Sequence, residues 1–81
     1  MDIREVFAQN LRAARQAKGL SQEELAHLAE IDRTYISSLE RCVYSVSIDV
    51  LERLATALGV EAADLLKSSP SQSSEMVSKS V

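Results

Sequence analysis

The chain has 81 residues, of which 46% are hydrophobic and 26% are charged, and twelve acidic against nine basic residues give a formal net charge of −3. This composition excludes a wholly disordered chain and fits one small globular domain. Because a chain this short buries only about 60% of its unfolded surface, we expect a dimer interface to add to its stability.

Reactive side chains are scarce, since the chain holds a single cysteine and a single histidine. One cysteine excludes an intramolecular disulfide framework and a cysteine-rich zinc site, and it fits a reducing, cytoplasmic setting. We interpret His27 as a solvated helix residue, and Cys42 as a loop residue or, alternatively, an oxidation sensor. The sequence has neither the apolar run of a membrane span nor a signal-peptide core. We therefore expect a protein that is not an enzyme and that binds no metal, no cofactor and no membrane.

Apolar residues three and four positions apart predict a first helix over about residues 2–18. Gly19 is expected to end this helix in the left-handed conformation, which glycine adopts without steric cost. The residues that would face the core are Ile3, Val6, Phe7, Leu11 and Ala14.

Two short helices are predicted next, joined by a tight turn. Ser21 and Glu24 have the spacing of a capping box, which starts a helix over about residues 22–29. Asp32 is a favourable N-cap for a third helix over about residues 33–41. The inward side chains of the two helices would be Leu25, Leu28, Ala29, Ile36 and Leu39. This layout is that of a helix-turn-helix, here at about residues 21–41.

Ser47 is expected to cap a fourth helix after an irregular loop at residues 42–46, and Gly59 to end it. A fifth, short helix is predicted over about residues 62–67, and the serine-rich composition of residues 68–81 is that of a tail. The inner face of the fourth helix would be Ile48, Leu51, Leu54, Ala55 and Leu58. We therefore expect an all-α, compact five-helix domain over residues 1–67, followed by a C-terminal tail.

Three stretches of the sequence carry a family resemblance: GLSQEELA at residues 19–26, DRTYISSLER at 32–41 and LATALGV at 54–60. They resemble the phage repressor and Cro-like helix-turn-helix family, also called the xenobiotic-response-element family, over roughly residues 7–67. The middle stretch is also similar to the controller proteins of restriction-modification systems. The resemblance implies a transcription regulator that binds a pseudo-palindromic operator on double-stranded DNA as a homodimer. RNA polymerase is then a further candidate partner.

The resemblance places the base-reading residues at the start of the third helix, the end that enters the major groove first. They are Arg33, Thr34 and, one turn further along the same face, Ser38. Arg33 can pair with guanine O6 and N7, and Thr34 can offer a hydroxyl group or contact a thymine methyl group. Without the motif, an exposed arginine at this position would be read as a solvated charge.

A second group of residues is implied to contact the DNA backbone, which fixes register without reading sequence. Gln22 would hold a phosphate with its side-chain amide at the N-terminus of the second helix. The others are Tyr35, Ser37, Arg41, Tyr44 and Ser45. The two tyrosines have an alternative role, which is to pack over the edge of the core with their hydroxyl groups in water.

Two further sets of residues have structural roles. Arg15 and Glu40 look like the family's buried ion pair between the first and third helices. The expected dimer interface comes from the fifth helix and from apolar positions near it: Val46, Val60, Leu65 and Leu66.

Several features depart from the family pattern. Glu30 stands where glycine is usual, so a left-handed conformation there would cost about 1 kcal/mol. Cys42 replaces the glycine usual after the third helix, and the loop that follows lacks arginine and lysine. The sequence pI of about 5.0 is also acidic for a nucleic-acid-binding protein. These features favour an alternative function, a protein-interaction module such as an antitoxin or adaptor, whereas the exposed start of the third helix opposes it.

Overall fold

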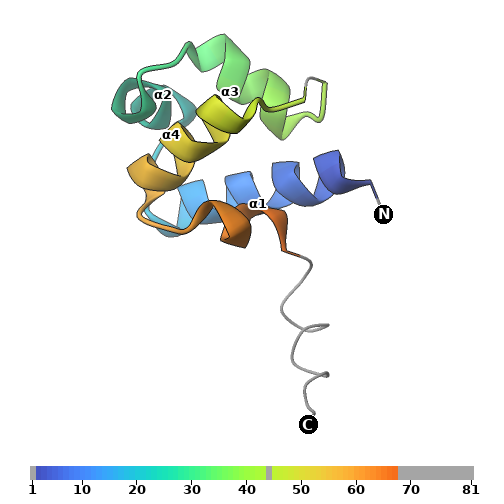
Figure 1. Cartoon of the computed structure of the whole chain (residues 1–81). Coiled ribbons are helices and arrows are strands. Elements are labelled where there is room, and N and C mark those ends of the chain that lie inside the picture. The colour runs from blue at the N-terminus through green and yellow to red at the C-terminus, as the bar shows by residue number, and fades with distance from the viewer. Residues whose placement is uncertain (1, 44, 68–81) are drawn as a thin grey trace, which may run out of the picture.

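The computed structural model describes residues 2–43 and 45–67. Over these residues the chain forms four α-helices and a final 3-10 helix, with no strand (Figure 1). The elements are α1 (Ile3–Ala17), α2 (Gln22–Ala29), α3 (Arg33–Glu40), α4 (Ile48–Leu58) and η1 (Ala62–Leu66). The predicted all-α layout of five elements is confirmed, with a 3-10 helix as the last of them. The predicted tail at residues 68–81 lies outside the described residues.

The helix boundaries follow the predicted capping residues. The Ser21 hydroxyl accepts from the backbone N–H of Glu24 at 3.0 Å, and the Glu24 carboxylate accepts from the backbone N–H of Ser21 at 2.8 Å. Asp32 caps α3 by accepting from the Thr34 N–H at 2.7 Å. Gly19 ends the turn after α1 with a φ of 71°. The starts of α2 and α3 are therefore defined by hydrogen bonds between residues that are close in the sequence.

The core lies between the four α-helices and η1. In Figure 1, α2 and α3 lie above α4, and α1 and η1 lie below it. Contacts join α2 to α3 and α4, and join α1 to α3 and η1. The largest fully buried side chains come from all five elements: Leu11, Leu25, Ile36, Leu39, Leu54, Leu58 and Leu65.

Three residues predicted to face the core are exposed instead: Ile3, Leu28 and Ile48. Ile3 and Ile48 are the first residues of their helices, where no neighbouring element covers them. Leu28 lies at the edge of α2, because the buried side of that helix is centred on Leu25, Ala26 and Ala29. The exposed fraction of Ile48 reaches 83%, which leaves a large apolar side chain in solvent.

One residue of the predicted dimer interface belongs to the core of the single chain. Leu65 is only 2% exposed, so it has no surface left to offer to a second chain. Its neighbour Leu66 is exposed, and Val46 and Val60 are half-buried against the core. The prediction for Leu65 is therefore wrong, because η1 turns that side chain inward.

A buried ion pair joins α1 to α3. The Arg15 guanidinium donates to both carboxylate oxygens of Glu40, at 2.7 Å through Nε and at 3.0 Å through Nη2. A third nitrogen, Nη1, donates to the Leu20 carbonyl at 2.9 Å. The Glu40 side chain is 1% exposed and the Arg15 side chain 13%. The pair expected from the sequence is thus present in a bidentate geometry, which is the strongest form of this interaction.

The surroundings of Glu40 keep its carboxylate charged. Burial raises the pKa of this group, but hydrogen bonds from Arg15 and Gln22 and the charges of Arg15 and Arg12 lower it more. The resulting pKa lies below the ordinary value of 4.5. Glu40 is therefore ionised at neutral pH, and its charge contributes to the stability of the fold.

Within residues 2–43 and 45–67, two residues other than glycine adopt left-handed backbone conformations, one on each side of α3. Glu30 has a φ of 60° and Cys42 a φ of 63°. Each conformation brings the side-chain Cβ close to the backbone and costs about 1–2 kcal/mol. The strain anticipated at Glu30 is thus present, and Cys42 carries it as well.

Replacement of Glu40 by glutamine should lower the free energy of unfolding at pH 7 by about 3 kcal/mol, because the partly buried Arg15 loses its anion. The folded pKa of Glu40 is lowered, so its contribution is present above about pH 4.5 and is lost as the pH falls through the folded pKa. The stability difference between the wild type and Glu40→Gln should therefore narrow below pH 4.5. Denaturant unfolding followed by circular dichroism, at a series of pH values across this range, measures the stability difference. A difference that stayed constant as the pH fell would contradict a lowered pKa for Glu40 in the folded protein.

Glycine at either strained position should stabilise the protein. We expect Glu30→Gly and Cys42→Gly each to raise the free energy of unfolding by about 0.5–1 kcal/mol, because relief of strain exceeds the added chain entropy of glycine. Glu52→Gly, inside α4, is the control and should be destabilising by about 1 kcal/mol. Thermal and denaturant unfolding of the three variants measure these differences, and destabilisation by all three would argue against backbone strain.

Candidate nucleic-acid interface

The first turn of α3 is presented to solvent while its other side is held in the core. Ile36 and Leu39 are fully buried, so they fix how α3 is rotated about its axis. Arg33 and Thr34 are exposed on the first turn. The arrangement leaves an arginine and a threonine projecting from the beginning of a rigidly seated helix, as reading of base edges requires.

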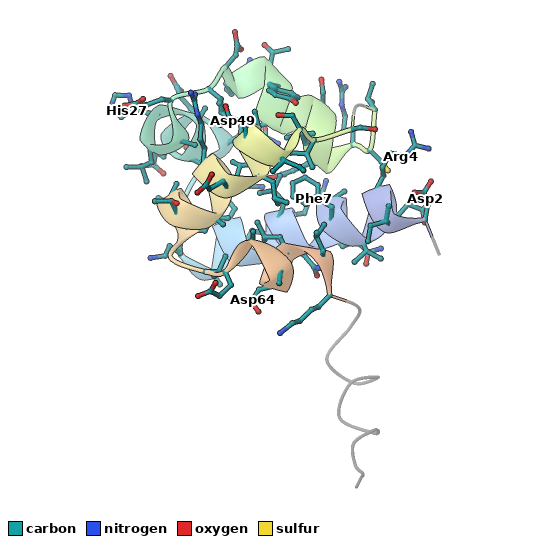
Figure 2. All side chains as sticks on the ribbon, in the orientation of Figure 1. Asp2, Arg4, Phe7, His27, Asp49 and Asp64 are labelled. Atoms are coloured by element: carbon teal, nitrogen blue, oxygen red, sulfur yellow. The ribbon has the colours of Figure 1, made fainter. Side chains whose placement is uncertain are left out.

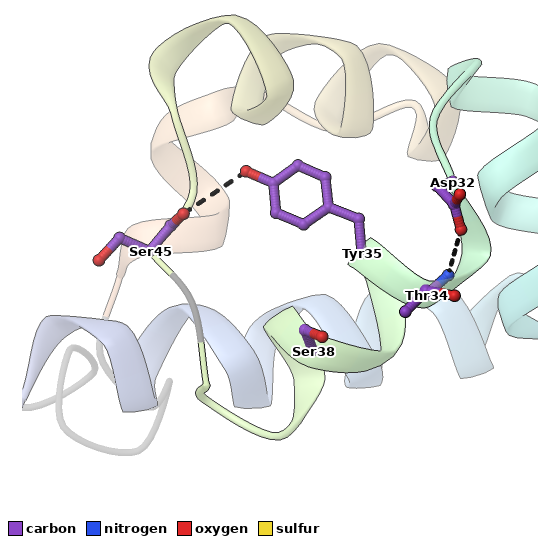
Figure 3. Close-up of a pocket in the computed structure, with 5 residues that line it drawn as sticks. All are labelled: Asp32, Thr34, Tyr35, Ser38 and Ser45. Atoms are coloured by element: carbon purple, nitrogen blue, oxygen red, sulfur yellow. Dashed lines mark hydrogen bonds between the residues drawn. The ribbon is translucent and has the colours of Figure 1, made fainter.

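A surface hollow lies beside this turn, between α3 and the segment that leads into α4. It is lined by Asp32, Thr34, Tyr35, Ser38 and Ser45 (Figure 3). The Tyr35 hydroxyl donates to the Ser45 carbonyl at 3.5 Å, a long contact that links the two walls. The Tyr35 side chain is half-buried and packs against the core, as its alternative role at the edge of the core requires, and its contact with a DNA phosphate stays a prediction.

Ser38 lies deeper than the other two predicted base readers. It lines the same hollow as Thr34, as expected for residues one turn apart, but it is only 4% exposed. Ser38 therefore forms part of the floor of the hollow, whereas the side chains of Arg33 and Thr34 are exposed.

Gln22, the first residue of α2, is half-buried and its amide is already engaged. Its Nε2 donates to the Glu40 carboxylate at 3.1 Å. A side-chain amide has two N–H groups, so one of them can serve Glu40 and the other an outside acceptor. This contact could not be predicted from the sequence, because the two residues are 18 positions apart and on different helices.

The other predicted backbone contacts lie around the C-terminal part of α3 and the loop after it. Arg41 and Ser45 are exposed, and Ser37 is half-buried. Tyr44 lies outside the described residues. Helix α3 thus carries Tyr35, Ser37 and Ser38, and Arg41 directly follows it. Ser45 lies across the hollow from this helix.

Acidic side chains gather on a different part of the surface. Glu23 and Glu24 line a hollow on α2 together with Leu28. Glu30 and Glu52 line a second hollow between α2 and α4 that also includes Leu28. His27 projects outward from this side of the domain (Figure 2). The negative net charge of the chain is therefore compatible with an anionic ligand at α3, where Asp32 is the only carboxylate lining the hollow.

Two features of the surface were not foreseen from the sequence. Arg12 on α1 lies with its Nε 3.6 Å from Glu40; its position three residues before Arg15, on the same side of the helix, was the available signal. The second feature is an apolar groove near the start of α1, lined by Ile3, Arg4, Phe7, Ser45, Val46, Ile48, Leu51 and Leu66.

The part of the chain that the structure describes contains no cluster of His, Cys, Asp and Glu side chains suited to a metal ion. None of its helices combines the length and the apolar character needed to cross a bilayer.

Comparisons with known proteins agree with this geometry. A family model described as helix-turn-helix matches residues 11–65. The chain is 48% identical over 65 residues to a hypothetical transcription factor of Neisseria meningitidis, covering 80% of this chain and 61% of that relative's length. It is 46% identical over 66 residues to the control protein C.BamHI of Bacillus amyloliquefaciens, covering 80% of this chain and 82% of the relative.

Solved structures show the same arrangement of helices. The crystal structure of the hypothetical transcription factor NHTF from Neisseria superposes with a TM-score of 0.85 at 43% identity, covering 93% of this chain and 86% of the other. The restriction-modification controller protein C.AhdI from Aeromonas hydrophila gives a TM-score of 0.75 at 47% identity, with coverages of 76% and 94%. The chain therefore belongs to the helix-turn-helix family of the phage repressor and xenobiotic-response-element type, a family of DNA-binding transcription regulators.

Proposed function

We propose that the protein is a sequence-specific transcription regulator that binds a pseudo-palindromic DNA operator as a homodimer. The observation that carries this proposal is the first turn of α3, where Arg33 and Thr34 are exposed on a helix anchored by Ile36 and Leu39. The similarity to controller proteins of restriction-modification systems supports the same reading.

DNA recognition would divide between two sets of side chains. Arg33 would pair with a guanine and Thr34 would contact a neighbouring base, while Ser38 would act from the floor of the hollow. Gln22, Tyr35, Ser37, Arg41, Tyr44 and Ser45 would hold phosphate or sugar groups. With two or three cationic phosphate contacts per protomer, the log-log salt slope of a dimer would be about −4 to −5.

The dimer would form through exposed apolar side chains near the start of α1 and α4. Ile3, Ile48 and Leu66 are exposed around one groove, with Val46 half-buried beside them. Val60, half-buried after α4, is a further candidate. A two-fold dimer would present its two α3 helices about 34 Å apart, one turn of B-DNA. Covering the groove would remove from water Ile48, the most exposed large hydrophobic side chain among the described residues.

The proposed regulator acts in the cytoplasm, where it occupies a promoter. Binding across the site of RNA polymerase gives repression, and binding beside it gives activation through contact with the polymerase.

A second candidate function is a protein-interaction module such as an antitoxin or adaptor. The observation that favours it is the exposed Leu28, which lies between acidic side chains on a face away from α3. Such a surface fits a basic protein segment rather than DNA.

Selection from a randomised DNA duplex pool at about 100 mM salt tests the two functions. We expect the wild type to enrich a two-fold related motif and Arg33→Ala to lose that preference, since one arginine–guanine pair contributes about 1–3 kcal/mol of discrimination. Arg53→Ala, an arginine on α4, is the control and should enrich the same motif as the wild type. Absence of enrichment by a folded wild-type dimer would instead support the protein-interaction module.

Replacement of Ile48 by glutamate tests the dimer surface. A glutamate in the first turn of α4 suits the helix dipole, so the fold should remain intact. The dissociation constant of the dimer should rise more than tenfold, because each protomer loses about 1.5–3 kcal/mol from the burial of an apolar side chain. Sedimentation equilibrium measures this, with Leu28→Glu as a control on the acidic face. An unchanged dimer in Ile48→Glu would place the interface elsewhere.

A further inference from the structure

We propose that Arg12, on α1, is a further phosphate-contacting residue of the DNA interface, positioned together with Gln22 by the buried carboxylate of Glu40. The inference rests on the proposed DNA-binding function and adds to it a residue outside the helix-turn-helix.

The geometry brings two different helices to one carboxylate oxygen. Oε1 of Glu40 accepts from Gln22 Nε2 at 3.1 Å and lies 3.6 Å from Arg12 Nε. Arg15 donates to both oxygens of the same carboxylate. Arg12 and Gln22 therefore lie beside each other, although they come from α1 and α2.

The charges around Glu40 do not cancel. Two guanidinium groups, of Arg12 and Arg15, face a single carboxylate, which leaves one net positive charge. Glu40 is buried and Arg15 is partly buried, with 13% of its side chain exposed, whereas the Arg12 side chain is 53% exposed. The surplus charge is thus presented to solvent by Arg12, next to the amide of Gln22.

Arg12 has donors to spare for an outside anion. An arginine carries five N–H groups, and only the Nε side of Arg12 faces Glu40. Among the described residues the Arg12 guanidinium has no other ion-pair partner. A phosphate of the DNA backbone matches this arrangement, because the planar fork of arginine binds phosphate oxygens in pairs and the neighbouring amide supplies another donor.

The alternative is that Arg12 only neutralises Glu40. The two roles predict different salt dependences of the affinity for DNA, because a phosphate contact releases a condensed counterion from the DNA and a contact within the protein does not. A loss of stability would lower the folded fraction without changing the slope of affinity against salt.

The test compares Arg12→Gln with Arg53→Gln on the operator selected by the wild type. The two variants lose the same charge from arginines of similar exposure, 53% and 48%. Dissociation constants are measured between 50 and 200 mM salt, with thermal unfolding as a check on folding. We expect Arg12→Gln to reduce the magnitude of the log-log slope by about 0.9 per protomer. For a dimer, the affinity ratio between wild type and variant then changes about tenfold over this range.

Arg53→Gln should keep the wild-type slope, and Arg12→Lys should restore most of it. An Arg12→Gln slope equal to that of the wild type, or an equal change in Arg53→Gln, would overturn the role of Arg12 while leaving DNA binding intact. Failure of the wild type to enrich any DNA sequence would overturn the proposed function and this inference with it.

Discussion

The bidentate contact between Arg15 and Glu40 is the interaction on which the position of α3 depends. Helices as short as α2 and α3, with eight residues each, are marginal in water and take their stability from the elements they pack against. Glu40 is the last residue of α3, and its carboxylate fastens that end to α1, the longest helix. The apolar side chains set the rotation of α3, and the ion pair determines where its C-terminal end lies along α1.

Features governed by local chemistry could be predicted from the sequence. The capping box at Ser21, the cap at Asp32 and the left-handed glycines depend on neighbouring residues only, so their positions follow from residue type and spacing. The Arg15–Glu40 pair came from the family resemblance instead, because nothing in the spacing of two residues 25 positions apart indicates contact.

Features that depend on what covers a surface could not be predicted. Periodicity gives the direction of a side chain relative to its own helix, but it does not show that Ile48 is left uncovered by the other described elements. The depth of Ser38 and the inward turn of Leu65 have the same cause, since both depend on how neighbouring elements pack. The contact between Gln22 and Glu40 required the relative placement of α2 and α3. For the candidate site, the residues that take part and the helix that carries them could be predicted, but the exposure of their side chains to solvent could not.

The left-handed backbone at Glu30 and Cys42 also bears on the lifetime of the protein in a cell. With glycine at both positions the chain would be more stable by about 1–2 kcal/mol in all, so the two residues raise the unfolded fraction about five- to thirtyfold relative to that chain. Proteases act on that fraction, and differences of this size change the abundance of a protein several-fold. Faster turnover makes the amount of protein follow its rate of synthesis closely, so that its concentration can fall soon after its gene is turned off.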